Sequence, residues 1–324
     1  DSATLPVVEN KPVAEDTAIL RLRDGQLRRM SPRMVDKYLA QSGAKDEVVE
    51  TIQTATDETL YFFTNKGNCF MLDVSKIPET MKLKDRGSLL TGLIAGLADH
   101  EHAVAMVCVK TDEMAKKGDF LFITKNGQVK RTSAAEYGIR RARFAAINLK
   151  GDDELIGMVQ VDPADKDDII LIPNQGLALR FKLATVSCTG RATAGVRGID
   201  VGQGDEVRWF EIPKAGDMLL VISDRGFGKR MLSDDVERQG RAGKGQQLLP
   251  MNKTGETGTQ LAVCLNVTGA QSVRVEQKHG HATTLNMDEV TVERRSSKGQ
   301  LLINVLLDDI VQYGALTAET KDEK

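Results

Sequence analysis

A short apolar strand, a polar turn with Gly and a second strand recur six times along the chain. Asn-Gly, Asp-Gly and similar dipeptides supply the positive φ angles that a tight β-hairpin needs. Runs of Ile, Val, Leu and Phe on either side of the turns favour strands. The six predicted hairpins span residues 18–29, 60–71, 120–131, 169–180, 219–230 and 273–284.

The turn glycines are Gly25, Gly67, Gly127, Gly176, Gly226 and Gly280. They lie roughly 40 to 60 residues apart, close to the about 40 to 50 residues of a propeller blade. This repeat predicts an all-β fold of six blades, and it overrides the prior of about 150 residues per domain. The predicted blades span 17–56, 57–115, 116–163, 164–213, 214–258 and 259–313, between a linker at 1–16 and a tail at 314–324.

Segments that combine Gly with Arg or Lys lie between the hairpins and the apolar strands that follow them. Examples are residues 84–90, 189–199, 238–248 and 294–301. Each unit is therefore expected to hold a hairpin, a basic connection and at least one further strand.

The chain has 44 Lys and Arg and 46 Asp and Glu, which gives a formal charge of −2. A nucleic-acid binder is usually basic overall, but a cationic stripe can bind while the opposite surface is acidic. The positions of the cations therefore matter more than their total. In four of the six units, cations follow the turn glycine at one register, namely Arg28, Arg29, Lys130, Arg131, Arg180, Lys229 and Arg230.

Cations that recur at one register would line one edge of a ring of blades, and DNA phosphates are the natural ligand of such an arc. For any single pair, a solvated strand end is the alternative. A Gly-rich basic loop at 239–245 (QGRAGKG) could bring backbone N–H groups and side chains to one phosphate. An ordinary surface turn is the alternative there. The loop lacks the spacing of a P-loop, so nucleotide binding is not expected.

Four stretches, at residues 65–67, 125–127, 191–199 and 224–230, resemble the C-terminal domains of type IIA topoisomerase A subunits, those of DNA gyrase and topoisomerase IV. The likeness spans nearly the whole chain. It implies a six-bladed β-pinwheel, a propeller-like disc of four-stranded blades whose basic rim bends or wraps duplex DNA. With the cation pattern it predicts DNA contacts from Arg28, Arg29, Lys130, Arg131, Arg180, Arg191, Arg197, Lys229, Arg230, Gln239, Arg241, Lys244, Arg294, Arg295 and Lys298.

Gyrase members of this family carry a Gln-Arg-Arg-Gly-Gly-Lys/Arg-Gly box in the first blade. The equivalent residues here, 41–47 (QSGAKDE), keep only the Gln. The box is associated with full wrapping and negative supercoiling, so a topoisomerase IV-type domain that bends DNA is favoured, with a gyrase-type domain as the alternative. The nearest match lies in the fifth unit, where Gly240 and Ala242 depart from the box while Gln239, Arg241, Gly243, Lys244 and Gly245 agree.

No residue pattern indicates catalysis or a metal site. The four cysteines, Cys69, Cys108, Cys188 and Cys264, are too far apart for a zinc or redox motif. Two His-x-His pairs, at 100–102 and 279–281, lack further ligands nearby. The resemblance likewise implies a non-catalytic domain without a cofactor, in a parent type II topoisomerase that uses ATP and Mg²⁺.

The resemblance also implies partners and a location. The expected partners are duplex DNA, the ATPase B subunit of the parent enzyme, and the rest of its A subunit, in the bacterial cytoplasm at the nucleoid. No apolar run approaches the ~18 to 20 residues of a membrane span. A propeller-type protein-interaction module that does not bind DNA stays the rival hypothesis, and the negative net charge favours it.

Overall fold

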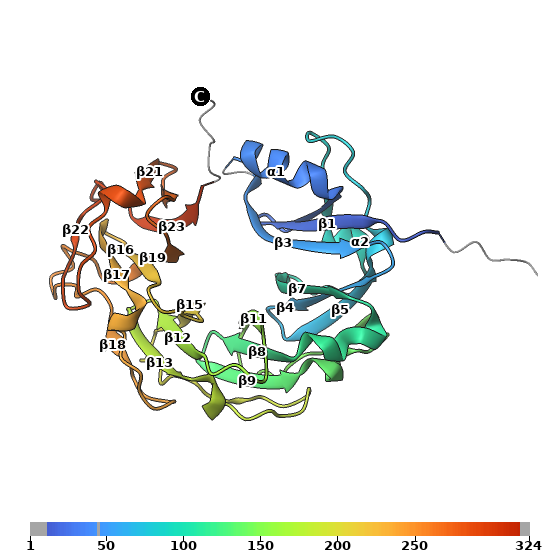
Figure 1. Ribbon diagram of the computed structural model, residues 1–324. Coiled ribbons are helices and arrows are strands. Elements are labelled where there is room, and N and C mark those ends of the chain that lie inside the picture. The colour runs from blue at the N-terminus through green and yellow to red at the C-terminus, as the bar shows by residue number, and fades with distance from the viewer. Residues whose placement is uncertain (1–11, 44–45, 318–324) are drawn as a thin grey trace, which may run out of the picture.

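Six small antiparallel sheets surround a common centre in the computed structural model, which describes residues 12–43 and 46–317 (Figure 1). The prediction of an all-β, six-bladed, propeller-like fold is confirmed. A hairpin forms in every unit, and its strands are β1 (Asp16–Leu22) and β2 (Gln26–Met30), β4 (Thr59–Thr64) and β5 (Asn68–Asp73), β8 (Asp119–Thr124) and β9 (Gln128–Ser133), β12 (Asp168–Pro173) and β13 (Leu177–Lys182), β16 (Met218–Ser223) and β17 (Phe227–Leu232), and β20 (Ser272–Gln277) and β21 (Ala282–Asn286).

A third strand pairs with the first strand of each hairpin, on the side that faces the centre of the disc in Figure 1. These inner strands are β3 (Val48–Ala55), β7 (Ala103–Val109), β11 (Leu155–Val161), β15 (Val207–Glu211), β19 (Leu261–Val267) and β23 (Val311–Leu316). The helices and 3-10 turns are α1 (Pro32–Gln41), α2 (Leu90–Leu93), η2 (Val74–Lys76), η3 (Thr111–Lys117), η4 (Ala134–Tyr137), η5 (Leu183–Thr185), η6 (Ser233–Asp235) and η7 (Met287–Glu289).

The outermost strand of the first five sheets comes from the next unit along the chain. These short strands are β6 (Ser88–Leu89), β10 (Arg143–Ala145), β14 (Val196–Arg197), β18 (Gln246–Gln247) and β22 (Gln300–Leu301), and each pairs with the second hairpin strand of the preceding sheet. We call the connections that carry them the exchange segments, residues 78–89, 138–147, 187–199, 237–249 and 291–303. The basic connections seen in the sequence are largely these segments, and they interlock neighbouring sheets.

Turn glycines also hold the ends of the exchange segments. Gly127 has a φ of 88° and accepts hydrogen bonds at its carbonyl from the backbone N–H groups of Gly198 and Ile199. A Cβ at Gly127 would lie 2.7 Å from the carbonyl oxygen of Ile199. Glycine is therefore needed here both for its left-handed backbone and for this close approach.

The sixth sheet has three strands, so the prediction of four-stranded blades is wrong for this one. Its second strand, β21, has no outer partner among the described residues. The cyclically equivalent connection is that of the first unit, where the chain forms α1 instead of an exchange strand. Pro32 begins this helix, at a position where its fixed φ is favourable and its missing N–H costs nothing.

Apolar clusters fill the five spaces between consecutive sheets, from the first to the sixth. The contact between the sixth sheet and the first is polar instead. Arg23 pairs with Glu276 at 2.9 Å, and its guanidinium lies over the Tyr313 ring, 3.5 Å from the centroid. The Tyr313 hydroxyl donates to Glu47 Oε1 at 3.0 Å. The disc is therefore closed at this one place by charged side chains.

Some predicted boundaries differ from the sheets. The boundary at 258 precedes β19, although β19 pairs within the fifth sheet. The strand β23 runs to Leu316, inside the predicted tail, and β1 begins at Asp16, inside the predicted linker. Residues 1–11 of the linker and 318–324 of the tail lie outside the described residues.

Candidate nucleic-acid interface

Two of the cations predicted to contact DNA are fully buried lysines, Lys130 and Lys229. Lys130 Nζ donates to the Tyr137 hydroxyl at 3.0 Å and to the carbonyls of Ala146 and Arg191 at 2.7 and 2.5 Å. Burial lowers the pKa of Lys130 to about 7. A side chain enclosed in this way cannot reach a phosphate, so the prediction for Lys130 is wrong.

Lys229 repeats the arrangement two units later. Its Nζ donates to the carbonyls of Arg294, Arg295 and Ser297 at 2.7, 2.8 and 2.5 Å. Burial lowers its pKa to about 8. The prediction that Lys229 contacts DNA is wrong as well. Lys229 holds the backbone of the fifth exchange segment, and Lys130 holds the backbone of the second and third.

Arg28 and Arg131 are also buried, at 6% and 8% exposure, and the prediction of direct DNA contact is wrong for both. Arg28 donates from Nη1 to the Asp85 carbonyl in the first exchange segment. Arg131 Nε donates to Asp119 Oδ2 at 2.8 Å, across its own hairpin.

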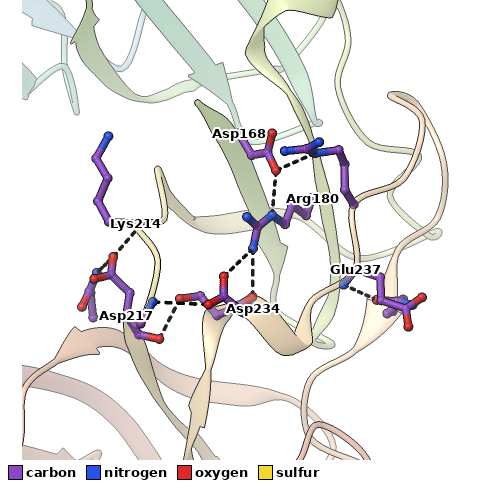
Figure 2. A network of polar contacts seen from close by, with 11 residues as sticks. Asp168, Arg180, Lys214, Asp217, Asp234 and Glu237 are labelled. Carbon is purple, nitrogen blue, oxygen red and sulfur yellow. Dashed lines mark hydrogen bonds and ion pairs between the residues drawn. The ribbon is translucent and has the colours of Figure 1, made fainter. Parts of the chain in front are cut away.

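Arg29, Arg180 and Arg230 are half-buried and engaged inside the protein. Arg29 Nε donates to the Ile77 carbonyl and Arg230 Nε to the Val290 carbonyl, both at 2.7 Å. Arg180 points toward Asp168 and Asp234 (Figure 2). Its Nε lies 2.8 Å from Asp168 Oδ2, and its Nη1 lies 3.6 Å from Asp234 Oδ1.

The common register of these arginines has a structural cause. The carbonyls of Arg29, Arg131, Arg180 and Arg230 each accept a backbone N–H from a residue at or near the start of an exchange segment, at 2.6 to 2.8 Å. The recurrence seen in the sequence therefore marks the docking points of these segments. It does not mark an exposed cationic track.

The exposed cations lie on the exchange segments themselves. Arg197, Lys244, Arg294 and Lys298 are exposed, as is Gln239, and Arg191, Arg241 and Arg295 are half-buried. The five segments together hold four acids, Glu79, Asp85, Glu237 and Glu293. Against these they hold fourteen cations, which are Lys82, Lys84, Arg86, Arg140, Arg141, Arg143, Arg191, Arg197, Arg238, Arg241, Lys244, Arg294, Arg295 and Lys298.

Two groups of cations on these segments had no DNA contact assigned from the sequence. Residues 82–86 carry three exposed cations, and the sequence analysis named 84–90 only as a basic connection. Residues 140–143 (RRAR) carry three more and were missed. The second group has no Gly, so it did not fit the Gly-containing pattern. The density of cations between the hairpin and the next apolar strand was the signal that could have found both.

Neighbouring exchange segments contact one another through arginines that recur four residues before a glycine. Arg191 Nη1 donates to the Ala145 carbonyl. Arg241 Nη1 donates to the Arg197 carbonyl at 2.7 Å, and Arg295 Nη1 to the Gln247 carbonyl at 3.3 Å. These joints link four of the five exchange segments, and we call the surface that these cation-rich segments form the basic surface.

Asp168 is a buried carboxylate that binds two arginines beneath this basic surface. It is almost fully buried, and its Oδ2 accepts from both Arg180 and Arg238, at 2.8 and 2.9 Å. Burial alone would raise the pKa of Asp168, but the hydrogen bonds and charges of the two arginines outweigh it and lower that pKa. Asp168 therefore fixes Arg238, at the start of the fourth exchange segment, onto the fourth sheet.

Other groups considered in the sequence lie apart from this surface. Cys69, Cys108 and Cys264 are buried free thiols, and Cys188 is exposed. In the described ranges, 12–43 and 46–317, no group of three or more His, Cys, Asp or Glu side chains could hold a metal ion. No helix within those ranges is long and apolar enough to cross a membrane.

Six antiparallel sheets, exchanged outer strands and basic rim segments define a propeller-type repeat domain. The family model described as DNA gyrase C-terminal domain, beta-propeller, matches residues 58–82, 118–162, 167–214 and 217–257. The DNA gyrase A subunit of Deinococcus deserti is 33% identical over 332 residues, covering 97% of this chain and 40% of that protein. The DNA gyrase A subunit of Chlamydia trachomatis is 31% identical over 254 residues, covering 78% of this chain and 29% of that protein.

Solved structures give the same fold. The C-terminal domain of DNA topoisomerase IV has a TM-score of 0.83 at 24% identity, covering 96% of both chains. The DNA gyrase A C-terminal domain has a TM-score of 0.64 at 20% identity, covering 94% of this chain and 100% of that one. The chain therefore belongs to the family of C-terminal domains of type IIA DNA topoisomerase A subunits, as its motifs predicted. It spans 40% of the length of the Deinococcus relative.

Proposed function

We propose that the rim formed by the exchange segments binds duplex DNA through its phosphates, independently of sequence. The observation that carries this proposal is the separation of charge. Fourteen of the 44 cations lie on the five short exchange segments with only four acids, so the rest of the chain is strongly acidic. A polyanion is attracted to such a stripe although the whole molecule has a charge of −2.

The size of the disc supports bending. A chain of this length has a radius of gyration of about 20 Å, so half of the rim spans roughly 80 Å. This length matches on the order of 25 base pairs. Bending such a segment by about 40 to 90° costs roughly 1 to 6 kcal/mol, which contacts to about 6 to 10 phosphates can offset.

The extent of the bend follows from where the basic surface ends. The sixth sheet has no exchange strand among the described residues, and the first unit has α1 in place of a basic segment. We therefore propose a partial bend, of the kind expected of a topoisomerase IV-type domain. Gyrase-type wrapping is the second candidate, and it is favoured by the relatives, which are named as A subunits of DNA gyrase.

The domain acts in this proposal as a DNA-presenting part of a larger enzyme. Strand cleavage, ATP and Mg²⁺ are assigned to the rest of that enzyme, which comprises an ATPase B subunit together with the remainder of the A subunit, at the bacterial nucleoid in the cytoplasm. Introduction of negative supercoils into relaxed plasmid by the full-length enzyme would establish the gyrase type. Relaxation and decatenation alone would establish the topoisomerase IV type.

A mobility-shift titration on a linear duplex of about 40 base pairs tests the binding itself. The double variant Lys244→Gln/Lys298→Gln should weaken binding to all sequences similarly. The matched control is Lys116→Gln, an exposed lysine in η3 outside the exchange segments, and it should bind as the unchanged chain does. No shift at micromolar protein and low salt would contradict DNA binding and favour the rival protein-interaction module.

A further inference from the structure

Two consecutive leucines are exposed on the connection from β22, at the rim, to β23, on the inner side of the sixth sheet (Figure 1). Leu306 is 68% exposed and Leu307 is 98% exposed. Single apolar side chains scattered over a surface need no explanation, whereas apolar side chains that gather there indicate a contact surface. We call residues 306–309 (LLDD) the leucine turn.

The backbone of the leucine turn is fixed from both neighbouring sheets. Its Asp309 N–H donates to the Leu306 carbonyl at 3.0 Å. Arg225, in the hairpin turn of the fifth sheet, donates from Nη1 to the carbonyls of Leu306 and Asp309 at 3.2 and 2.8 Å. The backbone N–H of His279, in the hairpin turn of the sixth sheet, donates to Asp309 Oδ1 at 3.1 Å. The two leucines are therefore presented on a rigid turn, and a partner that binds them orders little additional backbone.

The same turn recurs in three other units, so the chain itself shows which of its positions the fold needs. The turns span 98–101, 150–153 and 202–205, and in each the N–H of the fourth residue donates to the carbonyl of the first at 3.1 to 3.2 Å. The fourth residue is always acidic, and in Asp153, Asp205 and Asp309 its carboxylate accepts a backbone N–H from the adjacent hairpin turn. The first two residues of the other turns are small, polar or charged, namely Ala98 and Asp99, Lys150 and Gly151, and Gly202 and Gln203. Folding therefore requires the acid but not the leucines.

The chemistry of this connection suits a protein surface and not DNA. Residues 304–310 (NVLLDDI) hold two acids and no cation. Asp308 is exposed directly beside Leu307, and its charge repels phosphate. An apolar pocket that takes up the leucines, with a Lys or Arg at its edge for Asp308, matches both features.

The small area of the leucine turn identifies the source of that protein surface. Stable interfaces between free proteins bury roughly 1,200 to 2,000 Å² in total, and two leucine side chains supply only a small fraction of this area. A contact of this size holds when both surfaces belong to one linked polypeptide, because the effective concentration is then on the order of millimolar.

The proposed function links this domain to the remainder of an A subunit, and the chain spans only 40% of the length of the Deinococcus relative. We propose that the leucine turn docks into an apolar pocket on that remainder and holds the disc in one orientation on the parent enzyme. This inference rests on the proposed function. It adds a protein-docking point on a turn that carries no cation of the basic surface.

Photo-cross-linking in the full-length A subunit identifies the occupant. The cross-linking amino acid p-benzoylphenylalanine takes the place of Leu307, and mass spectrometry of the irradiated subunit identifies the joined peptides. Cross-links to the remainder of the A subunit are expected, with a yield that does not depend on protein concentration. The matched control places the same amino acid at Gln203, the exposed equivalent of Leu307 in the fourth unit, and should give far fewer such cross-links. Cross-links from position 307 mainly to a second copy of this domain or to the B subunit, or a yield no higher than at position 203, would overturn the inference.

The double variant Leu306→Ser/Leu307→Ser separates docking from folding and from DNA binding. The chain alone should unfold at the same urea concentration, since both positions are exposed, and should bind duplex with unchanged affinity. In the full-length subunit, a protease should cleave the connection between this domain and the remainder about tenfold faster or more, because the loss of two buried leucines shifts the docking equilibrium by at least that factor. Unchanged cleavage would overturn the docking, and weaker duplex binding by the variant would assign the turn to the DNA interface instead. If the unchanged chain binds no duplex, the proposed DNA binding fails, and the cross-link from position 307 still decides the docking.

Discussion

Arg241 donates from Nη1 to the carbonyl oxygen of Arg197 across 2.7 Å, and this hydrogen bond joins two consecutive exchange segments. The Arg197 side chain itself is exposed and takes no part in the joint. The two arginines therefore carry the same charge on the same surface, but only one of them holds the surface together.

This difference gives a matched pair of variants. Arg241→Gln should lower the free energy of unfolding by about 0.5 to 1.5 kcal/mol, the worth of one hydrogen bond. Arg197→Gln should change it by less than about 0.5 kcal/mol, as is usual for surface positions. Both should weaken duplex binding to a similar degree. Urea denaturation and a binding titration measure the two effects. Equal stability of the two variants would contradict the claim that the hydrogen bond from Arg241 stabilises the contact between the two segments.

Lys229 and Lys298 separate stability from DNA binding in the last exchange segment. Lys229→Met leaves three carbonyls without their donor and removes a fully buried ammonium group, so it should cost about 2 to 4 kcal/mol of unfolding free energy. Lys298→Met removes an exposed charge, so it should change stability by less than about 0.5 kcal/mol and still weaken duplex binding. A Lys229→Met variant that is as stable as the unchanged chain but binds DNA more weakly would contradict this structural role and indicate that Lys229 contacts DNA.

The ionisation of Asp168 makes the free energy of unfolding depend on pH. Its pKa is lowered in the folded protein, because hydrogen bonds and charges from Arg238 and Arg180 outweigh its burial. The stabilisation is therefore present above the ordinary carboxyl pKa of about 3.9 and is lost as pH falls through the lowered value. Asp168→Asn should cost about 2 to 3 kcal/mol at pH 7 and flatten the fall in stability below about pH 4. Urea midpoints from pH 7 to pH 2 measure it, and parallel curves for the two proteins would contradict the assignment.

Ala242 has a φ of 71°, a conformation that is strained for any residue with a Cβ. Gly stands at this place in the gyrase box. Ala242→Gly should therefore stabilise the chain by about 0.5 to 1 kcal/mol. The control is Ala145→Gly in β10, an exposed strand position, which should destabilise by a similar amount. Thermal unfolding measures both, and a loss of stability in Ala242→Gly would contradict the strain.

The hairpins were predictable because Gly turns and apolar runs are local signals. The exchange strands were not, because a two-residue strand such as β14 has no periodicity and its partner lies in another unit. The burial of Lys130 was not visible either. Its acceptors include the carbonyl of Arg191, which lies 61 residues away in the sequence. The sequence analysis placed candidate cations both at the strand ends and on the connections, and only those on the connections, such as Arg197 and Lys244, are exposed in the structure.

The dependence of duplex affinity on salt tests the central claim most directly. If the exchange segments neutralise about 6 to 10 phosphates, affinity should fall about 10³- to 10⁵-fold between 50 and 200 mM salt. The logarithmic slope should be about −5 to −9, and Lys244→Gln should reduce its magnitude by about 1. An affinity that hardly changes with salt, or a slope that Lys244→Gln leaves untouched, would contradict a DNA-binding rim built from these segments.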